Sequence, residues 1–318
     1  MSRRHLLLGL LVAAVLGVMV LIGRHPTPQQ AISLRPALDR ATETKAAVER
    51  LGEGTFKASD PEERVLGVQL EGFLLNEWGT SISADYPGRT WLQAIALRLQ
   101  AGGGLRRGAV FSYSVTLLES PAVNAFSLPG GRLFVTTGML RFLETEAEAA
   151  ALLGHEMAHV DLRHCIERYQ YELKARRLGG APLAAMAGMG FRLMLQGYQD
   201  EQEAEADRWG MQLAARAGYH PQAAQCLFAR LASPQNSPRT LPAEALNTTV
   251  DSLQDLLASH PDPSARIISL EIAMRECGLD PERQRYYLGI RNRQELRSRS
   301  EQEYSEEWVQ HRLMVPSH

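Results

Sequence analysis

The spacing of apolar positions changes along the chain, and each spacing predicts a different element. Residues 6–22 are continuously apolar and uncharged, whereas 59–79 and 90–100 place apolar side chains at helical intervals. Apolar residues alternate with smaller or polar ones over 109–118, which predicts a strand, and we expect a second strand at 132–137. The first half of the chain therefore combines helices with a small amount of sheet.

The second half of the chain has mostly helical patterning. Thr145 stands three residues before Glu148, which is the spacing of a capping box, and no proline follows until Pro182, so we expect one long helix. The apolar, glycine-rich stretch 178–197 has three interpretations: a lid, a hairpin dipping into a membrane, or core. A further helix over 200–217 ends at a glycine.

The apolar N-terminal segment predicts a membrane anchor. A helix of 17 residues spans about 26 Å, enough to cross a bilayer once. Arg3 and Arg4 precede it, and no small-residue cleavage site follows, so we expect an uncleaved anchor over 1–23. The positive-inside rule then puts the remaining chain outside the cytoplasm, on the periplasmic side of the inner membrane in a bacterium. The alternative, a buried helix of a soluble domain, lacks an obvious partner.

Composition narrows the range of functions. The chain carries 36 acidic and 34 basic side chains, so its near-neutral charge gives no reason to expect nucleic acid as a partner. Three cysteines lie far apart in the sequence and predict no disulfide framework, and we expect Cys165 to be a buried core residue. The oligomeric state is not encoded in any pattern that we recognise.

The candidate chemistry lies in the long helix, where His155, Glu156 and His159 form an HExxH motif. Residues four apart lie on one face of a helix, so both imidazoles can reach one cation, while Glu156 lies beside it. A catalytic zinc ion usually takes three protein ligands and keeps one position for water. The motif therefore predicts a zinc site with one ligand still to be found.

The helix over 200–217 offers that ligand. Glu203 and Asp207 are four residues apart and share a face, whereas Glu205 projects elsewhere, so we expect Glu203 to complete the metal site. Asp207 then accepts the outer N–H of a ligating histidine. His164 lies five residues after His159, about 140° around a continuous helix, which favours a structural role for it.

The sequence resembles the zinc metalloendopeptidases of peptidase family M48. The resemblance rests on NAFSLPGGRLFVTTGML, LLGHEMAHVDLRH, EQEAEADRWG and SHPDPSARI, and it covers about 60–275. It implies an α+β, predominantly helical domain of the zincin-like (gluzincin) type, with Glu203 as third ligand and Glu156 as general base. It also implies polypeptide substrates bound by strand addition at Asn124, Ala125 and Phe126 and the strand over 132–137.

The resemblance implies further features outside the HExxH helix. His260 matches a family histidine that stabilises the developing oxyanion or serves as an extra metal ligand. We expect a membrane anchor or signal segment at 1–23, a linker with a short helix at 24–59, a zinc metallopeptidase domain at 60–277 and a charged helix or frayed tail at 278–318. A single membrane crossing favours quality control of envelope proteins over processing of prenylated substrates.

Two other functions remain compatible with the sequence. One is a catalytically silent relative that acts as a chaperone or assembly scaffold, although the complete set of His155, Glu156, His159 and Glu203 argues against decay of the site. The other is a structural helical protein in which HExxH is accidental, and the acidic residues of the second helix argue against that.

Overall fold

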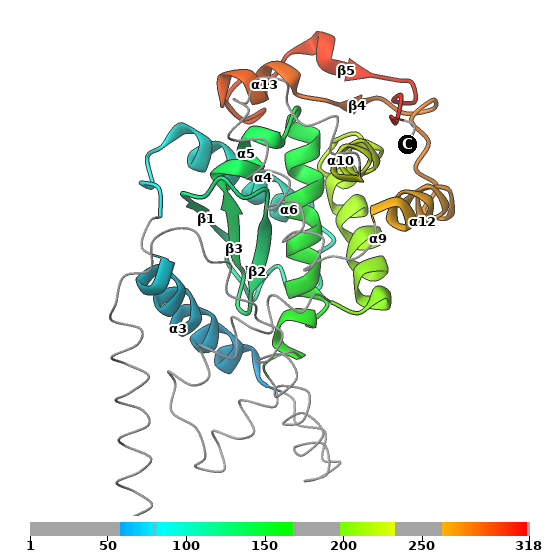
Figure 1. Cartoon of the computed structure of the whole chain (residues 1–318). Helices are drawn as coiled ribbons and strands as arrows, with labels where there is room; N and C mark the ends of the chain where they lie inside the picture. The colour runs from blue at the N-terminus through cyan, green and yellow to red at the C-terminus, as the bar shows by residue number, and fades with distance from the viewer. Residues whose placement is uncertain (1–57, 79–80, 168, 170–197, 233–262, 317–318) are drawn as a thin grey trace, which may run out of the picture. The chain divides into compact units, whose positions relative to one another are not determined.

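A three-stranded sheet with helices on both faces forms the centre of the computed structural model (Figure 1). The structure describes residues 58–78, 81–167, 169, 198–232 and 263–316. All of these belong to one compact unit, Thr55–His318. The expected anchor at 1–23, almost all of the linker at 24–59, the stretch 178–197 and His260 lie outside the described residues. Among the helices that are described, none is both long and apolar enough to cross a membrane.

Eight α-helices, five strands and one 3₁₀ helix make up the described part of the chain. The helices are α3 (Asp60–Trp78), α4 (Pro87–Ala101), α5 (Thr137–Phe142), α6 (Glu146–Asp161), α9 (Asp200–Arg216), α10 (Ala223–Ala232), α12 (Pro263–Glu276), α13 (Ile290–Glu295) and the 3₁₀ helix η2 (Ser305–Glu307). The strands are β1 (Ser114–Leu118), β2 (Ala125–Leu128), β3 (Arg132–Thr136), β4 (Tyr286–Tyr287) and β5 (Trp308–Val309). The predominantly helical composition with a small sheet confirms that part of the predicted fold class.

Strand β3 lies in the middle of the main sheet. It pairs in parallel with β1 and antiparallel with β2, and the turn between β2 and β3 uses Gly130 and Gly131 at φ 77° and 85°. Strand β1 begins at Ser114 because residues 106–110 form turns, so the strand expected over 109–118 is shorter than predicted. Since β3 is paired on both sides, the expectation that it offers a free edge to substrate is wrong, and the outer strands of the sheet are β1 and β2.

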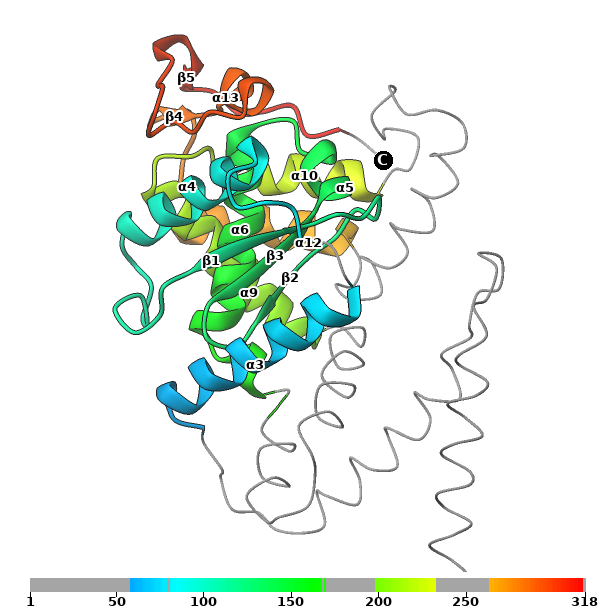
Figure 2. The ribbon, with the colours of Figure 1, turned by 90° about the vertical axis from the view of Figure 1, so that its left-hand side faces the viewer.

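Both faces of this sheet are covered, as Figure 2 shows. Leu133 and Val135 of β3 face the larger core, which α4, α6, α9 and α10 complete. Phe134 faces the smaller core under α3, where it stacks on Phe126 with ring centroids 4.9 Å apart. Burial on both faces explains why the strands are more continuously apolar than a half-exposed sheet requires.

Helix α6 begins where the sequence predicts but ends earlier. The Thr145 hydroxyl accepts a hydrogen bond from the Glu148 amide at 3.0 Å, which caps the first turn. The helix stops at Asp161, and Arg163 takes the left-handed conformation with φ 73°. The expectation of one continuous long helix beyond this point is therefore wrong, because the backbone turns sharply before a short helical turn over 164–167.

The C-terminal segment packs on the start of α6. It contains the β4–β5 pair and α13, which lie together at the top of Figure 1. The amides of Glu146 and Ala147 donate to the carbonyls of Gly289 and Leu288 at 3.0 and 2.9 Å. This segment forms two short strands, turns and the short helix α13, where the sequence suggests a charged helix or frayed tail.

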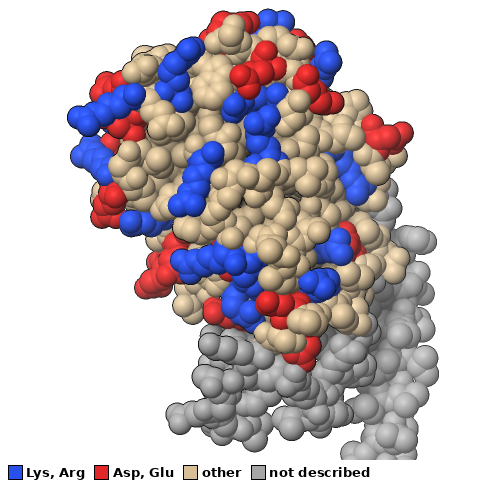
Figure 3. Space-filling model, turned by 180° about the vertical axis from the view of Figure 1, so that it is seen from behind, with Lys and Arg blue, Asp and Glu red and all other residues tan. Residues whose placement is uncertain are grey.

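Charged side chains of both signs are interspersed on the surface. On the face that Figure 3 presents, Arg side chains lie close to Asp and Glu side chains, with wide uncharged areas between them. Exposed ion pairs in the described part of the chain include Arg208 with Glu276 and Arg291 with Glu306. Exposed pairs of this kind contribute little to stability.

Candidate metal centre

The two histidines of the HExxH motif meet Glu203 of the neighbouring helix α9. The Nε2 atoms of His155 and His159 lie 3.0 Å apart, as their four-residue spacing in α6 requires. Each Nε2 lies 3.5 Å from a different carboxylate oxygen of Glu203. All three side chains are buried, and their ligand atoms lie within 4.8 Å of one another. The structure thus brings together the three residues expected to bind metal.

The spacing of these atoms fits a zinc ion. Ligand bonds of about 2.05 Å in a tetrahedron place neighbouring ligand atoms about 3.3 Å apart. The three measured separations, 3.0, 3.5 and 3.5 Å, bracket that value. Two imidazoles and one carboxylate are also the donor set of a catalytic zinc site that keeps a position for water. The residues present can therefore hold zinc.

Asp207 lies behind His155, one helical turn after Glu203. Its Oδ1 is 2.9 Å from Nδ1 of His155, so it can accept the outer N–H of that ring. Although burial opposes ionisation, the positive charge of Arg266 holds the pKa of Asp207 below its usual value. Burial and Arg266 act to lower the pKa of His155, but Asp207 and Glu203 outweigh them and raise it.

Arg266 of α12 is a site residue that the sequence analysis missed. Its guanidinium binds Asp207 through two hydrogen bonds of 2.8 and 2.6 Å and approaches Glu203 at 3.4 Å. It lies over the ring of Phe228 at 3.9 Å from the centroid. Its position at the end of SHPDPSAR, a segment that carries the resemblance, was the available signal. A buried cation here balances the two acids of α9.

His164 lies against His159, in contrast to the prediction that it points away. Their Nδ1 atoms are 3.0 Å apart, and His164 Nε2 lies 3.2 Å from Glu205 Oε2. The prediction is wrong because it assumed a continuous helix, whereas α6 ends at Asp161. Burial lowers the pKa of His164. Glu205, which we expected to project elsewhere, is therefore connected to His159 through His164.

Glu156 has a partner on the sheet. Ser127 of β2 lies with its Oγ 2.9 Å from Glu156 Oε2 and 3.3 Å from the Cys165 thiol. Cys165 is buried, as expected, and its sulfur is also 3.2 Å from the Tyr198 hydroxyl. The ring of Tyr198 stacks on His159 at 3.6 Å between centroids. Glu156 and His159 are therefore joined through a largely buried network of contacts that local sequence spacing does not predict.

The residues expected to bind substrate backbone lie on β2 or just before it. Asn124 shares a hydrogen-bonded pair with β3, since Thr136 N donates to its carbonyl at 3.0 Å. In an antiparallel ladder the backbone groups of the next residue, Ala125, then point to the opposite edge. The side chain of Phe126 is buried under α3. Of the three, Ala125 presents its backbone groups away from the sheet.

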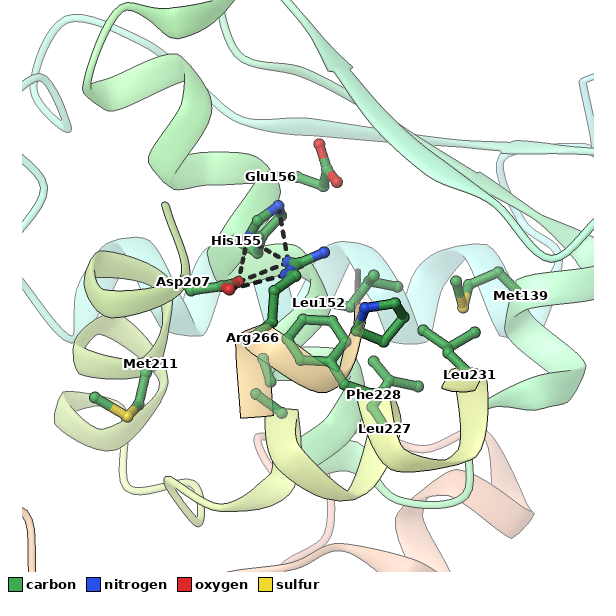
Figure 4. Close-up of a pocket in the computed structure, with 13 residues that line it drawn as sticks. Met139, Leu152, His155, Glu156, Asp207, Met211, Leu227, Phe228, Leu231 and Arg266 are labelled. Atoms are coloured by element: carbon green, nitrogen blue, oxygen red, sulfur yellow. Dashed lines mark hydrogen bonds and ion pairs between the residues drawn. The ribbon is translucent and has the colours of Figure 1, made fainter. Parts of the chain in front are cut away.

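An apolar pocket opens beside His155 and Glu156, between α6, α10 and α12 (Figure 4). Figure 4 shows Arg266 and Asp207 on the polar side of this pocket, below His155. The opposite walls are apolar and comprise Met139, Leu152, Leu227, Phe228 and Leu231. A mostly apolar pocket with a few polar or charged groups on one wall is the usual composition of a ligand site.

The fold and the site together define an HExxH-type metallopeptidase domain, in which a helix bearing two histidines meets a glutamate from a second helix. Comparison with known proteins agrees with that class. The model of peptidase family M48 matches residues 88–273, which is more than half of the chain. The chain belongs to peptidase family M48. The resemblance drawn from the sequence motifs is thereby confirmed.

Several characterised proteins are similar to this chain. Mitochondrial metalloendopeptidase OMA1 of Arabidopsis thaliana is 29% identical over 169 residues, which are 49% of this chain and 30% of that protein. The Schizosaccharomyces pombe protein of the same name is 26% identical over 207 residues, 62% of this chain and 57% of the relative. Beta-barrel assembly-enhancing protease of Yersinia pestis is 26% identical over 168 residues, 48% and 32% respectively. The matched regions thus span from about a third to somewhat more than half of these relatives.

Proposed function

We propose that the chain is a zinc-dependent endopeptidase that hydrolyses peptide bonds in polypeptide substrates. The observation that carries this proposal is the convergence of His155, His159 and Glu203 on one buried point, with Glu156 beside it. Membership of a peptidase family supports the same reaction. Zinc held by these side chains would polarise a substrate carbonyl and lower the pKa of bound water to about 7.

Glu156 supplies the acid and base chemistry. Its carboxylate accepts a proton as water attacks the carbonyl carbon and returns that proton to the amine nitrogen when the C–N bond breaks. Ser127 Oγ, 2.9 Å from Oε2, holds the carboxylate in one orientation. Because Glu156 is adjacent to the ligand His155 in α6, a substrate near the metal also lies near the base.

Strand addition to β2 provides a means of holding the substrate backbone. The backbone groups of Ala125 point to the free edge, and Ser127 on the same strand contacts Glu156. A peptide paired with this edge therefore passes close to the base. Asn124 and Phe126 contribute indirectly by fixing β2 against β3, Asn124 through its backbone and Phe126 through the stacking of its ring on Phe134. His260 lies outside the described residues and keeps its two proposed roles, oxyanion stabiliser or extra ligand.

The apolar pocket supports a preference for a large apolar residue next to the cleaved bond. Leu152 is one turn before Glu156 on α6, so the pocket begins where the reacting carbonyl would lie. Its apolar walls gain free energy by burying a Leu, Phe or Met side chain, by about 25 cal/mol per Å² of apolar surface. Segments with exposed apolar residues, as in misfolded proteins, fit this description.

We further propose a membrane-anchored protein that acts in envelope protein quality control, with its catalytic domain outside the cytoplasm. Relatives named mitochondrial metalloendopeptidase and beta-barrel assembly-enhancing protease support a role of this kind. The uncharged stretch over 6–22 supports anchoring. Protease treatment of intact spheroplasts tests the orientation: the proposal expects digestion of the large domain, and its protection would reverse the orientation.

Cleavage of casein tests the proposed activity. The purified full-length chain should degrade casein, and Glu156→Gln should reduce the rate by at least about 100-fold, because the base is lost while the metal ligands remain. Equal, low rates for both proteins would contradict the enzyme and favour the chaperone or scaffold. Binding of unfolded casein without cleavage would support that alternative directly.

A further inference from the structure

A second histidine, His164, lies directly behind the ligand His159 and links it to Glu205. The two Nδ1 atoms are 3.0 Å apart, and His164 Nε2 is 3.2 Å from Glu205 Oε2. His164 is buried, whereas 67% of the Glu205 side chain is exposed to solvent. A line of polar contacts therefore runs from the protein surface to the metal centre.

The direction of each hydrogen bond in this line follows from the metal site. Nε2 of His159 faces His155 and Glu203, so it must be free of hydrogen to bind a cation. The ring then carries its hydrogen on Nδ1 and donates it to Nδ1 of His164. His164 in turn carries hydrogen on Nε2, where Glu205 accepts it. A carboxylate at the outer end favours this one arrangement of hydrogens.

The ring of His159 needs such a partner. Tyr198 stacks on its face with an interplanar angle of 12°, which limits tilting. Stacking does not distinguish the two ring orientations related by a 180° flip about the Cβ–Cγ bond, so it leaves open which side of the ring faces Glu203. A hydrogen bond to Nδ1 does distinguish them, because it places Nε2 on the side of Glu203.

We propose that His164 and Glu205 are positioning residues that fix the tautomer and orientation of the metal ligand His159. This inference rests on the proposed zinc site. Asp207 performs the same task for His155 by direct contact at 2.9 Å, from a buried position beside Arg266. The two histidines of α6 are thus held in different ways. His155 contacts the buried carboxylate of Asp207 directly, whereas His159 contacts the exposed carboxylate of Glu205 through the imidazole of His164.

The rate of zinc release to a chromogenic chelator tests the proposal in the full-length chain. Glu205→Ala should release zinc about tenfold faster than the unmodified chain, at the low end of the 10 to 100-fold effects of outer partners on metal affinity. Glu201→Ala is the matched control, because it removes an exposed carboxylate one turn earlier on the same helix. It should change the rate by less than about twofold. Equal rates for both variants would overturn the proposal.

A double variant separates a relay from two independent effects. His164→Ala should accelerate release at least as much as Glu205→Ala, and adding Glu205→Ala to it should produce no further change, since Glu205 acts through His164. If the two substitutions multiply each other's effect on the rate of zinc release, the proposal is wrong. If His164→Ala does not fold, the exposed Glu205 and Glu201 variants still decide the outcome.

Cobalt absorption provides a readout that general destabilisation would not change. With Co²⁺ in place of zinc, Glu205→Ala should shift the visible ligand-field bands, because His159 is reoriented, while Glu201→Ala should not. Unshifted bands in both variants would overturn the proposal. If the unmodified chain binds one zinc but Glu205→Ala behaves like the control Glu201→Ala, only the proposed role of His164 and Glu205 is refuted. An unmodified chain that binds no zinc refutes the proposed function as well.

Discussion

Gly154 of α6 and Gly210 of α9 lie against each other with no side chain between them. A Cβ atom on Gly210 would stand 2.6 Å from the amide nitrogen of His155, and one on Gly154 would stand 2.8 Å from the Gly210 carbonyl oxygen. Gly210 is seven residues after Glu203, and therefore on nearly the same face of α9. The two glycines allow the helices to approach closely enough for Glu203 to reach the histidines.

Gly210→Ala should therefore weaken both the fold and the metal site. The added methyl group forces α6 and α9 apart, at a cost of about 1 to 3 kcal/mol in the free energy of unfolding, and zinc affinity should fall with it. Urea unfolding and zinc competition measure the two effects. Gly72→Ala in α3 is the control, since a Cβ there meets nothing within 4 Å and should be neutral or stabilising by up to about 1 kcal/mol. Equal behaviour of the two variants would contradict close packing at Gly210.

Glu146 anchors the C-terminal segment to the start of α6. It accepts hydrogen bonds from the Tyr219 hydroxyl at 2.5 Å, Trp91 Nε1 at 3.0 Å and the Arg299 amide at 3.0 Å. Glu146→Ala leaves these buried donors without their acceptor and should lower the free energy of unfolding by about 3 kcal/mol or more. Loss of the exposed pair partner in Glu276→Ala should cost less than about 1 kcal/mol. If Glu146→Ala also lowered the free energy of unfolding by less than about 1 kcal/mol, the anchoring role of Glu146 would be contradicted.

Stability should decline in mild acid because of His220. Its Nε2 donates to the His311 carbonyl and its Nδ1 accepts from the Gln222 amide, so the structure requires a neutral ring. Burial lowers the pKa of His220 to about 4. The unfolded chain, with a pKa of about 6.5, binds a proton first as the pH falls, so stability is lost between about pH 6.5 and 4.

The size of the His220 effect is up to about 3 kcal/mol at pH 4. Urea unfolding of His220→Gln at pH 7 and pH 5 should show a smaller loss on acidification than the unmodified chain. His311→Gln removes an exposed imidazole and should leave that loss unchanged. Parallel pH dependence in the unmodified chain and His220→Gln would refute the assignment.

Filling the apolar pocket should change substrate preference. Leu152 lines this pocket one turn before Glu156. Leu152→Phe should lower kcat/KM by about tenfold for peptides with Leu or Phe next to the cleaved bond, while peptides with Ala there should be cleaved nearly as before. Paired kinetics on two such peptides measure the ratio. A uniform loss on both peptides would indicate general damage rather than a binding pocket.

Sequence spacing is sufficient to predict which site residues share a face of the same helix. His155 and His159 share a face of α6, and Glu203 and Asp207 share a face of α9, so the four-residue interval alone places each pair. The motifs that carry the family resemblance then associate the two helices. Helices α3, α4 and α9, the start of α6 and the central strand follow from the same local periodicities, whereas α5, α10 and α12 were not predicted.

Sequence spacing does not predict the contacts of residues that follow the end of a helix. Asp161, the last residue of α6, accepts hydrogen bonds from the amides of Arg106 and Arg107 and from Trp209 Nε1. These partners lie about 50 residues away along the chain in either direction. No local sequence pattern therefore predicts where α6 ends. Because the position of His164 depends on that end, its contact with His159 cannot be derived from spacing.

The C-terminal segment was also beyond local prediction. Strands β4 and β5 contain two residues each, too few to produce an alternating pattern. They are stabilised by distant contacts, including the hydrogen bond from Tyr287 N to the Gly218 carbonyl and the packing of Arg299 on Trp308. Composition rich in Arg and Glu describes the exposed surface of this segment but not its buried anchors.

Zinc content of the purified full-length chain is the most direct test of the metal centre. The account predicts one zinc per chain, its loss in Glu203→Ala, and its retention in Glu201→Ala, because Glu203 lies 3.5 Å from both histidines whereas Glu201 is exposed on α9. A Glu203→Ala protein that keeps one tightly bound zinc would contradict the central claim that His155, His159 and Glu203 hold the metal.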